Sequence, residues 1–309
     1  MFVRRDPVAA PPAEGGGKLP QSEGDASDGV PVAVRPLPSR ANAHLDLDSN
    51  HHDSLTDSEI QALVEVGEVG FLHSFDAGSG IDGPGLRAVL WTAGCHFRCV
   101  YCHNPDTWKV RNGRIATVDD TMGEIVKYQR FWRNASGGVT ISGGEPLVQT
   151  PFVRRVFHAC KRLGIHTALD TNGALGAQLS DTDLLDIDLV LLDVKAFTAP
   201  MHLRVTGQTI DRTLAFAARL AALQRPTWIR YVLVPGLTDD PVEIDGVAAL
   251  AATWPNVARV EVLPFHQLGR FKWERLGIPY LLSDTESPSG AALEAARARF
   301  RAAGLRVVV

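Results

Sequence analysis

Residues 87–102 read RAVLWTAGCHFRCVYC, a short apolar run followed directly by a loop that carries three cysteines. Cys95, Cys99 and Cys102 are spaced as C-x3-C-x2-C, and only one of the chain's four cysteines lies outside this loop. Three thiolates on one short loop can bind three irons of a 4Fe–4S cluster. Because such clusters usually have four cysteine ligands, this loop would leave one iron open to a substrate or cofactor.

Two other uses of these cysteines explain less of the pattern. A zinc site usually closes with four ligands, and the only local fourth candidate, His103, directly follows Cys102 and is poorly placed to complete a tetrahedron. A redox pair of Cys99 and Cys102 would leave Cys95 idle. An iron–sulfur cluster is the interpretation that uses all three thiols. Cys160 has apolar neighbours at helical spacing and is expected to pack in the core.

From residue 69 onward, short apolar or β-branched runs alternate with helical patterns. Strands are predicted at 69–73, 87–93, 138–142, 166–170, 188–193, 227–234, 259–264 and 305–309. Helices are predicted at 118–132, 150–163, 181–185, 212–223, 241–253 and 290–303, with Gly304 as the last C-cap. This alternation implies parallel strands joined by crossover helices, and about six such units indicate an α/β barrel, full or partial.

The amino-terminal region has a different composition. Residues 1–53 are rich in Pro, Gly, Ser, Asp and Ala, which predicts a disordered acidic tail. Residues 1–68 hold five Lys/Arg and twelve Asp/Glu, a net charge of -7, so the remainder is near +3 in a chain of net charge -4. A short linker helix is expected within 54–68, where Thr56 and Glu59 form a capping box.

Composition and charge exclude several classes of protein. No apolar run reaches the roughly 18 residues of a membrane-spanning helix, so no membrane association is expected. No apolar segment follows Arg4 and Arg5 to make a secretory signal. The nearly neutral remainder has no basic stripe, which argues against a nucleic-acid partner. Because three of the four cysteines are clustered, they make no disulfide framework, and a reducing cytoplasm is expected.

Polar and glycine residues follow the ends of successive predicted strands. They are the cysteine loop after 87–93, Gly143-Gly144-Glu145-Pro146 after 138–142, Asp170-Thr171-Asn172-Gly173 at the end of 166–170, Asp193-Val194-Lys195 at the end of 188–193 and Phe265-His266 after 259–264. In α/β barrels the carboxyl ends of the strands carry the active site. We therefore expect these segments to meet on one face.

Each segment also has a structural interpretation. The glycines at 143–144 suit either a strand-to-helix turn or a close ligand, with Glu145 as acceptor for an ammonium group. The segment 170–173 is either an Asx turn or a source of oxygens for a cation. Asp193 and Lys195 are two residues apart, so on an extended strand they lie on the same face. They are either a structural ion pair or groups that bind a ligand.

Three further residues or segments are candidates of the same kind. Arg230 lies in the apolar run 228–232, where a charge needs a partner, either a barrel carboxylate or the substrate backbone. The segment from Asp82 to Gly85 is a turn that also makes a rigid exposed ridge. His266 is either a loop histidine or a cofactor contact.

Together these segments resemble the pyruvate formate-lyase activating enzymes, a family of glycyl radical enzyme activases in the radical S-adenosylmethionine (SAM) superfamily. The matching stretches are 73–75, 82–87, 95–108, 134–138, 169–173, 228–236, 263–269 and 272–273. The first 68 residues have no counterpart in that family, and Pro146 stands where some members carry Ala. The resemblance implies that 69–309 is the catalytic domain, a partial (β/α)6-type TIM barrel of the radical SAM type.

The resemblance also implies an activity and partners. SAM would be cleaved reductively, and a Cα hydrogen would be taken from a glycine of pyruvate formate-lyase, which leaves a glycyl radical used in anaerobic metabolism. A flavodoxin- or ferredoxin-like protein would donate the electron, and the enzyme would be a monomer. Here Cys160 is the only cysteine beyond the motif, so no auxiliary cluster is expected, which favours the pyruvate formate-lyase type. The alternatives are another glycyl radical enzyme as partner, or a small-molecule substrate.

The residue roles implied by the resemblance form four groups. Cys95, Cys99 and Cys102 would bind the cluster. The SAM contacts would be Tyr101, His103, Gly143, Gly144, Glu145, Asp193, Val194, Lys195 and His266. Asp170 and Thr171 would form a monovalent-cation site, and Asp82, Gly83 and Arg230 would contact the substrate peptide.

Overall fold

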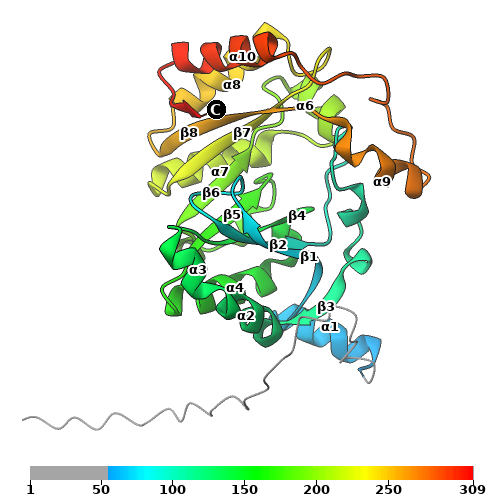
Figure 1. The fold of residues 1–309 in the computed structure, drawn as a ribbon, viewed down its shortest axis with the longest axis vertical. Helices are drawn as coiled ribbons and strands as arrows, with labels where there is room; N and C mark the ends of the chain where they lie inside the picture. The colour runs from blue at the N-terminus through cyan, green and yellow to red at the C-terminus, as the bar shows by residue number, and fades with distance from the viewer. Residues whose placement is uncertain (1–54, 309) are drawn as a thin grey trace, which may run out of the picture. The chain divides into compact units, whose positions relative to one another are not determined.

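A computed structural model describes residues 55–308 of the chain. The predicted tail, 1–53, lies outside these residues. Within them, nine strands form one mixed sheet in the order β3-β1-β2-β4-β5-β6-β7-β8-β9, with helices packed around it (Figure 1). The strands are β1 (Val69–Ser79), β2 (Arg87–Thr92), β3 (Arg114–Thr117), β4 (Gly138–Gly143), β5 (His166–Thr171), β6 (Leu189–Asp193), β7 (Thr227–Leu233), β8 (Val257–Pro264) and β9 (Val307–Val308).

The parallel part of the sheet confirms the predicted barrel architecture. Strands β2, β4, β5, β6, β7 and β8 pair in parallel in this order, and β9 continues the parallel pairing beyond β8. On the other side of β2, strands β1 and β3 pair in antiparallel fashion. Because β3 and β9 remain as the two edges, the barrel is partial.

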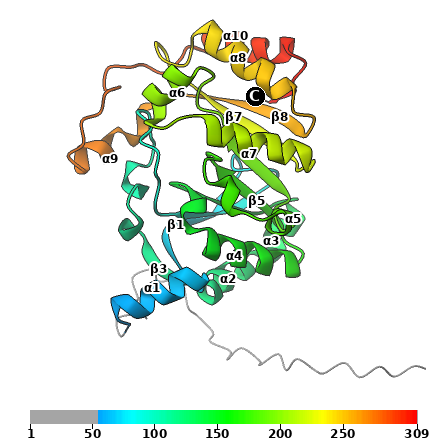
Figure 2. The ribbon, with the colours of Figure 1, turned by 180° about the vertical axis from the view of Figure 1, so that it is seen from behind.

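The α-helices mostly lie in the crossovers between parallel strands. They are α1 (Asp57–Val66), α2 (Val118–Lys127), α3 (Gln129–Asn134), α4 (Thr150–Arg162), α5 (Asp181–Leu185), α6 (Ala199–Thr206), α7 (Asp211–Ala222), α8 (Pro241–Ala252), α9 (Arg270–Arg275) and α10 (Gly290–Ala302). Short 3-10 turns follow the strand ends, among them η1 (Pro105–Thr107), η2 (Val110–Asn112), η3 (Pro146–Gln149), η4 (Gly176–Gln178) and η5 (Gln267–Gly269). Helices α8 and α10 lie side by side at one end of the sheet, and α1, α2 and α4 gather at the other (Figures 1 and 2).

Local sequence signals set several helix ends. Thr56 and Glu59 form the predicted capping box at the start of α1, and Gly67 ends that helix in the left-handed conformation at φ 78°. Gly304 likewise adopts a left-handed φ of 83° just after α10. The helix predicted at 118–132 is in fact two helices, because the backbone leaves helical geometry at Tyr128.

The sequence patterns did not predict β3, α6 or α9. Strand β3 has four residues and exists through its backbone pairing with β1, which local composition does not show. Helices α6 and α9 are eight and six residues long, too short for a clear apolar period. Both lie against the cysteine loop, as described below.

The hydrophobic core lies between the sheet and its helices. It includes the predicted core residue Cys160, which is fully buried on α4 beside Val156 and Phe157. Arg87, at the start of β2, is also fully buried and donates to Thr140 Oγ1 and to the Val139 carbonyl. None of the helices in 55–308 has the length and apolar character needed to span a bilayer.

Candidate active site

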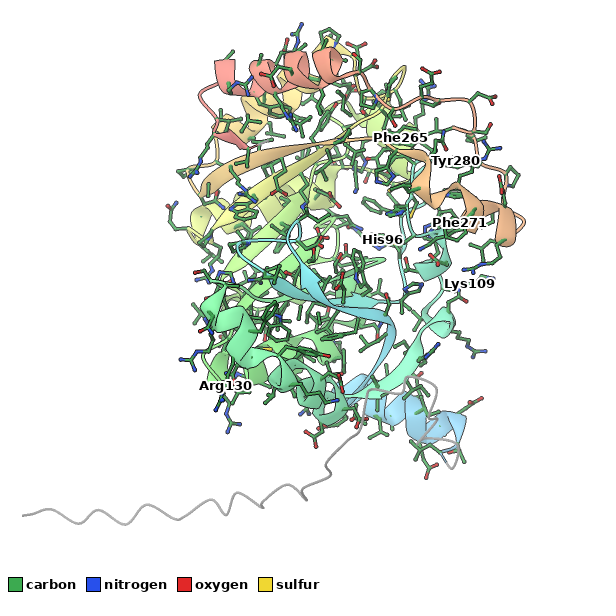
Figure 3. The ribbon with its side chains drawn as sticks, viewed as in Figure 1. His96, Lys109, Arg130, Phe265, Phe271 and Tyr280 are labelled. Atoms are coloured by element: carbon green, nitrogen blue, oxygen red, sulfur yellow. The ribbon has the colours of Figure 1, made fainter. Side chains whose placement is uncertain are left out.

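A cavity of about 270 Å³ lies at the carboxyl ends of the parallel strands, where the sequence predicted the site. Each predicted strand-end segment contributes to its wall: the three cysteines after β2, Gly143 and Gly144 at β4, Asp170 at β5, Asp193 and Lys195 at β6, Arg230 on β7 and His266 after β8. Tyr101, His103 and Asp82 also line it. In Figure 3, His96 of the cysteine loop, Phe265 after β8, and Phe271 and Tyr280 of the following segment all lie on the right of the view.

Backbone hydrogen bonds hold the cysteine loop on three sides. The Cys95 amide donates to the Trp108 carbonyl at 3.1 Å, and the Gly94 carbonyl accepts from the Glu145 amide at 2.8 Å. The amides of Arg98 and Val100 donate to the last residues of α6, at 2.8 and 2.9 Å. These bonds tie the loop to the turn at 105–108, to the end of β4 and to α6.

The three thiols are the only cysteine side chains at the cavity. Burial raises the pKa of the Cys99 thiol to about 12, and it raises the pKa of Cys95 and Cys102 as well. A metal that binds thiolates displaces these protons. Within 55–308 no three His, Cys, Asp or Glu side chains converge on a single metal ion. The sulfurs fit a cluster, in which each cysteine binds a different iron.

Two glycines bring the end of β4 against this loop. A Cβ on Gly143, which has a φ of +129°, would lie 2.2 Å from the Thr92 carbonyl oxygen. A Cβ on Gly144 would lie 2.4 Å from the Gly94 carbonyl oxygen and 3.0 Å from Cys95 Cβ. The glycines thus serve both interpretations: they form the turn, and they line the cavity beside the cysteines.

Glu145 lies behind the cavity wall rather than in it. Its carboxylate is fully buried and accepts from the Leu147 amide at 3.1 Å, the Thr171 hydroxyl at 2.7 Å and the Asn172 amide at 2.8 Å. Burial raises the pKa of Glu145 to about 7, although these three hydrogen bonds oppose the rise. Glu145 therefore ties the β4 turn to the end of β5, and Thr171 is part of this tie.

Arg230 is the centre of an ion network at the floor of the cavity. It contacts Glu261 at 2.9 Å, Asp170 at 3.2 Å and Asp82 at 3.6 Å. It also donates to the Ile81 carbonyl at 2.7 Å, so it holds the predicted ridge against the barrel. Burial opposes the Arg230 charge, but the carboxylates, Asp170 first, raise its pKa above the usual value.

Asp170 retains one free oxygen in this network. Its Oδ2 atom accepts from Ser142 at 2.6 Å and from Arg230, whereas its buried Oδ1 atom has no hydrogen-bond partner. Burial raises the pKa of Asp170 to about 6, although Arg230 opposes the rise. A buried carboxylate oxygen without a partner is a candidate ligand atom for a cation.

A second ion pair also lines the cavity. Lys195 Nζ contacts Asp193 Oδ2 at 2.7 Å and lies 5.8 Å from the centre of the Tyr101 ring. Burial opposes the Lys195 charge, but Asp193 outweighs it, and the Lys195 pKa lies well above its usual value. Val194 between them is buried and does not line the cavity. The buried Tyr101 hydroxyl has no hydrogen-bond partner.

The segment after β8 closes one side of the site. His266 packs edge-on against His103 at 4.9 Å between ring centres, and burial, followed by His266, lowers the pKa of His103. On α9, Lys272 donates to Asn104 at 2.7 Å, and the Trp273 indole donates to the Cys102 carbonyl at 2.9 Å. These contacts join the carboxyl-terminal segment to the cysteine loop.

The cavity includes side chains that the sequence analysis did not select. They are Trp91, Phe97, Asn104, Thr107, Trp108, Ser142, Val232, Leu263 and Pro264. Ser142 adjoins the predicted segment 143–146 and could have been found by extending the strand-end rule by one residue. Trp108 carries no local signal, because it reaches the cavity through the turn at 105–107. Among the selected residues, Gly83, Glu145, Thr171 and Val194 do not line the cavity.

Comparisons with known proteins agree with this geometry. Residues 89–245 match the Radical SAM superfamily. The pyruvate formate-lyase-activating enzyme of Staphylococcus epidermidis is 42% identical over 237 residues, which cover 74% of this chain and 93% of the relative. The enzyme of the same name from Staphylococcus aureus strain USA300 is 43% identical with the same coverage.

A solved structure supports the fold alone. The radical SAM methyltransferase from Sphaerobacter thermophilus aligns with a TM-score of 0.53 at 15% identity, over 83% of this chain and 82% of its own. Membership of the superfamily implies a 4Fe–4S cluster and SAM as cofactors, and the three cysteines at the cavity fit that implication. The chain therefore belongs to the radical SAM superfamily, within the family of the pyruvate formate-lyase-activating enzymes.

Proposed function

We propose that this protein activates pyruvate formate-lyase by taking a Cα hydrogen from one glycine of that enzyme, which leaves a glycyl radical. The observation that carries the proposal is the meeting of the cysteine loop, the glycine turn of β4 and the charged ends of β5 to β8 around one cavity. Identity of 42–43% along almost the whole length of the pyruvate formate-lyase-activating enzymes supports this choice of partner.

Cys95, Cys99 and Cys102 would bind the cluster at the cavity wall. When bound, the cluster supplies the electron for the reductive cleavage of SAM, and the resulting radical chemistry removes the hydrogen. The protein's part is to hold the reactants and exclude water. The backbone bonds from α6, Trp108 and Glu145 support this part, because they hold the cysteine loop in place.

The remaining groups would orient SAM in the same cavity. Gly143 and Gly144 line the cavity beside the cysteines, where the amino and carboxylate groups of the methionine part of SAM would lie. Asp193 and Lys195 offer one charge of each sign, and the free Tyr101 hydroxyl lies beside them. His103 and His266 would flank the adenosine. Glu145 and Val194 would act from behind the wall, as positioning residues.

The floor of the cavity would serve a cation and the substrate peptide. Asp170, through its unpartnered Oδ1 atom, would bind a monovalent cation beside SAM, with Thr171 in support. Asp82 faces the cavity, and Arg230 holds the neighbouring Ile81 carbonyl. We infer that Arg230 serves the peptide indirectly, by fixing the Asp82–Gly83 ridge.

We expect the enzyme to work as a monomer in a reducing cytoplasm. Its electron donor would be a flavodoxin- or ferredoxin-like protein. Cys160 is buried in the core away from the cavity, so within 55–308 the three loop cysteines are the only thiols placed for a cluster. This favours the pyruvate formate-lyase type over activases with auxiliary clusters.

The test is anaerobic electron paramagnetic resonance (EPR) of the reconstituted full chain with SAM, a reductant and the pyruvate formate-lyase of the same cell. A glycyl radical doublet is expected, and it should vanish when the partner's radical-bearing glycine is changed to alanine. If an intact, reducible cluster gives no doublet but still cleaves SAM, the partner assignment is wrong. If SAM is not cleaved, the activity itself is wrong.

A further inference from the structure

Arg87 is a buried charge to which the proposed function gives no role. Its side chain is fully buried at the start of β2, yet no carboxylate in 55–308 forms an ion pair with it. Its Nε atom donates to Thr140 Oγ1 at 3.0 Å, and its Nη2 atom donates to the Val139 carbonyl at 2.5 Å. Its Nη1 atom lies 3.0 Å from His166 Nδ1. Because a buried charge without polar partners is costly, these contacts fix the place of the guanidinium.

Thr140 extends this contact to the segment before β2. Its hydroxyl accepts from Arg87 Nε and donates to the Asp82 carbonyl oxygen at 2.6 Å. The direction of both bonds is settled, because a guanidinium can only donate and a carbonyl can only accept. Thr140 is fully buried, so no water competes for its hydroxyl. A relay of two hydrogen bonds therefore connects Arg87 to the main chain of the Asp82–Gly83 ridge.

Gly83 lies directly against the same relay. Its φ is +126°, and a Cβ there would lie 3.2 Å from Arg87 Nε and 3.6 Å from Thr140 Oγ1. Glycine adopts such a backbone conformation without strain and leaves room for the close approach. Gly83 does not line the cavity, so its contact with the relay is a physical reason for glycine at this position.

The strand register places the relay beneath the cavity. Positions 138, 140 and 142 alternate along β4 and so share one face of the strand. Ser142 lines the cavity, whereas Gly138 pairs with Arg87 at the other end of β4. A Cβ on Gly138 would lie 2.9 Å from Arg87 Nη1, so the guanidinium covers this face there. Thr140 therefore lies between the guanidinium and the cavity.

The ridge is held at two consecutive carbonyls from two different strands. Arg230 on β7 donates to the Ile81 carbonyl at 2.7 Å, and Thr140 on β4 donates to the Asp82 carbonyl. The Ser79 hydroxyl donates to the Asp82 carboxylate at 2.5 Å. Since Asp82 lines the cavity, the contacts with β4 and β7 determine how far its side chain reaches into that space.

We propose that Arg87 and Thr140 are positioning residues that set the height of the Asp82–Gly83 ridge at the cavity floor, and thereby the depth at which the substrate glycine stops. The inference rests on the proposed function, in which this ridge contacts the substrate peptide. A ridge that moved would misplace the Cα hydrogen, and the rates of positioned reactions fall steeply with small displacements. SAM cleavage without the partner enzyme does not involve the ridge, which separates the two effects.

The test uses Thr140→Val and Thr140→Ser in the full chain, reconstituted anaerobically. Valine has the shape of threonine but no hydroxyl, whereas serine keeps the hydroxyl. In Thr140→Val, kcat/KM for glycyl radical formation on the partner enzyme should fall about tenfold, because the buried Asp82 carbonyl loses its donor. SAM cleavage without the partner should stay within about twofold of the wild type, and Thr140→Ser should stay within about twofold in both rates.

Thr167→Val is the matched control. Thr167 is also a fully buried strand threonine, and it donates to the Asp186 carbonyl at 2.7 Å, but it does not contact the ridge. A second readout needs neither SAM nor the partner enzyme: hydrogen–deuterium exchange in the segment 80–86, followed by mass spectrometry. Exchange there should be about tenfold faster in Thr140→Val, because the ridge opens more often, and unchanged in Thr167→Val.

Gly83→Ala covers the case in which Thr140→Val does not fold. The added Cβ pushes the ridge away from Arg87, so the same loss of kcat/KM is expected. Its control is Gly80→Ala, where an added Cβ has no neighbour within 4 Å. A wild-type kcat/KM in Thr140→Val or Gly83→Ala, or an equal loss in Thr140→Ser, Thr167→Val or Gly80→Ala, would overturn the inference while the proposed function stands. A wild-type protein that forms no glycyl radical would overturn both.

Discussion

Replacement of Glu145 by glutamine tests how the site is held together. The wild-type carboxylate accepts from the Leu147 and Asn172 amides and from the Thr171 hydroxyl, and none of it is exposed to solvent. Glutamine has only one acceptor oxygen, so its NH2 group must face a backbone N–H. The loss of one charge-assisted bond and the burial of an unpaired donor should together lower the free energy of unfolding by roughly 3 kcal/mol at pH 8.

The pH dependence provides a sharper measurement. Burial raises the pKa of Glu145 from 4.5 to about 7, so between these values the folded state binds more protons than the unfolded state. The contribution of Glu145 to wild-type stability therefore falls as the pH rises toward about 7, and it levels off above. Glutamine does not titrate. The stability difference between the two proteins should thus grow by about 2 kcal/mol when the pH is lowered from about 8 to 5.5.

The assay is urea unfolding of both proteins, under argon, at several values of pH in this range. Their difference removes the contributions of groups that titrate alike in both proteins. Glu243→Gln is a control for the general cost of the exchange, because Glu243 also accepts from two backbone amides and a threonine hydroxyl. Parallel pH profiles for wild type and Glu145→Gln would refute the reasoning about burial and protonation.

Four further outcomes are expected. Cys99→Ala should abolish cluster assembly, whereas Cys160→Ala should lower the melting temperature but keep the iron content; equal iron loss from both would contradict the ligand assignment. Gly144→Ala should prevent cluster and SAM binding, because the added Cβ would clash with the cysteine loop. The control is Gly123→Ala, where an added Cβ has no neighbouring atom within 4 Å; its stability in calorimetry should be unchanged or slightly higher. Arg230→Met should cost about 3–5 kcal/mol in urea unfolding, because it leaves buried carboxylates unpaired, and a loss below about 1 kcal/mol would show that the network is not cooperative. Removal of residues 1–53 should leave iron content and SAM cleavage unchanged, and a loss of either would assign the tail a role in the site.

Much of the architecture could be predicted because its signals are local. The apolar runs of β2, β4, β5, β6 and β7 lie within two residues of their predicted ranges, and the capping box of Thr56 and Glu59 follows from local sequence. Gly304 has the expected left-handed conformation but lies one residue beyond Ala303, the C-cap of α10. Strand β1 is six residues longer than predicted, because its second half exists through pairing with β2 and not through an apolar pattern.

The partners of Arg230 could not be predicted from the sequence alone. A charge in an apolar strand indicated a buried partner, but the choice between a barrel carboxylate and the substrate backbone needed the parallel register that sets Arg230 beside Asp193 and Glu261. Three carboxylates and the Ile81 carbonyl occupy its donors. The polar partners of Arg230 are internal, and the proposed contact with the substrate peptide is left to the ridge that Arg230 holds.

By itself, the sequence determined the kind of chemistry: C-x3-C-x2-C defines three thiolates on one loop, and alternating strand and helix patterns direct successive strand ends to one face. The tertiary structure alone decided which neighbours surround those groups. It placed Glu145 behind the cavity wall, and it brought the Trp273 indole, 171 residues away in the chain, onto the Cys102 carbonyl. The reason is physical. Ligand spacing and hydrophobic period are properties of short segments, whereas hydrogen-bond partners depend on how distant segments pack, and no short segment encodes that packing.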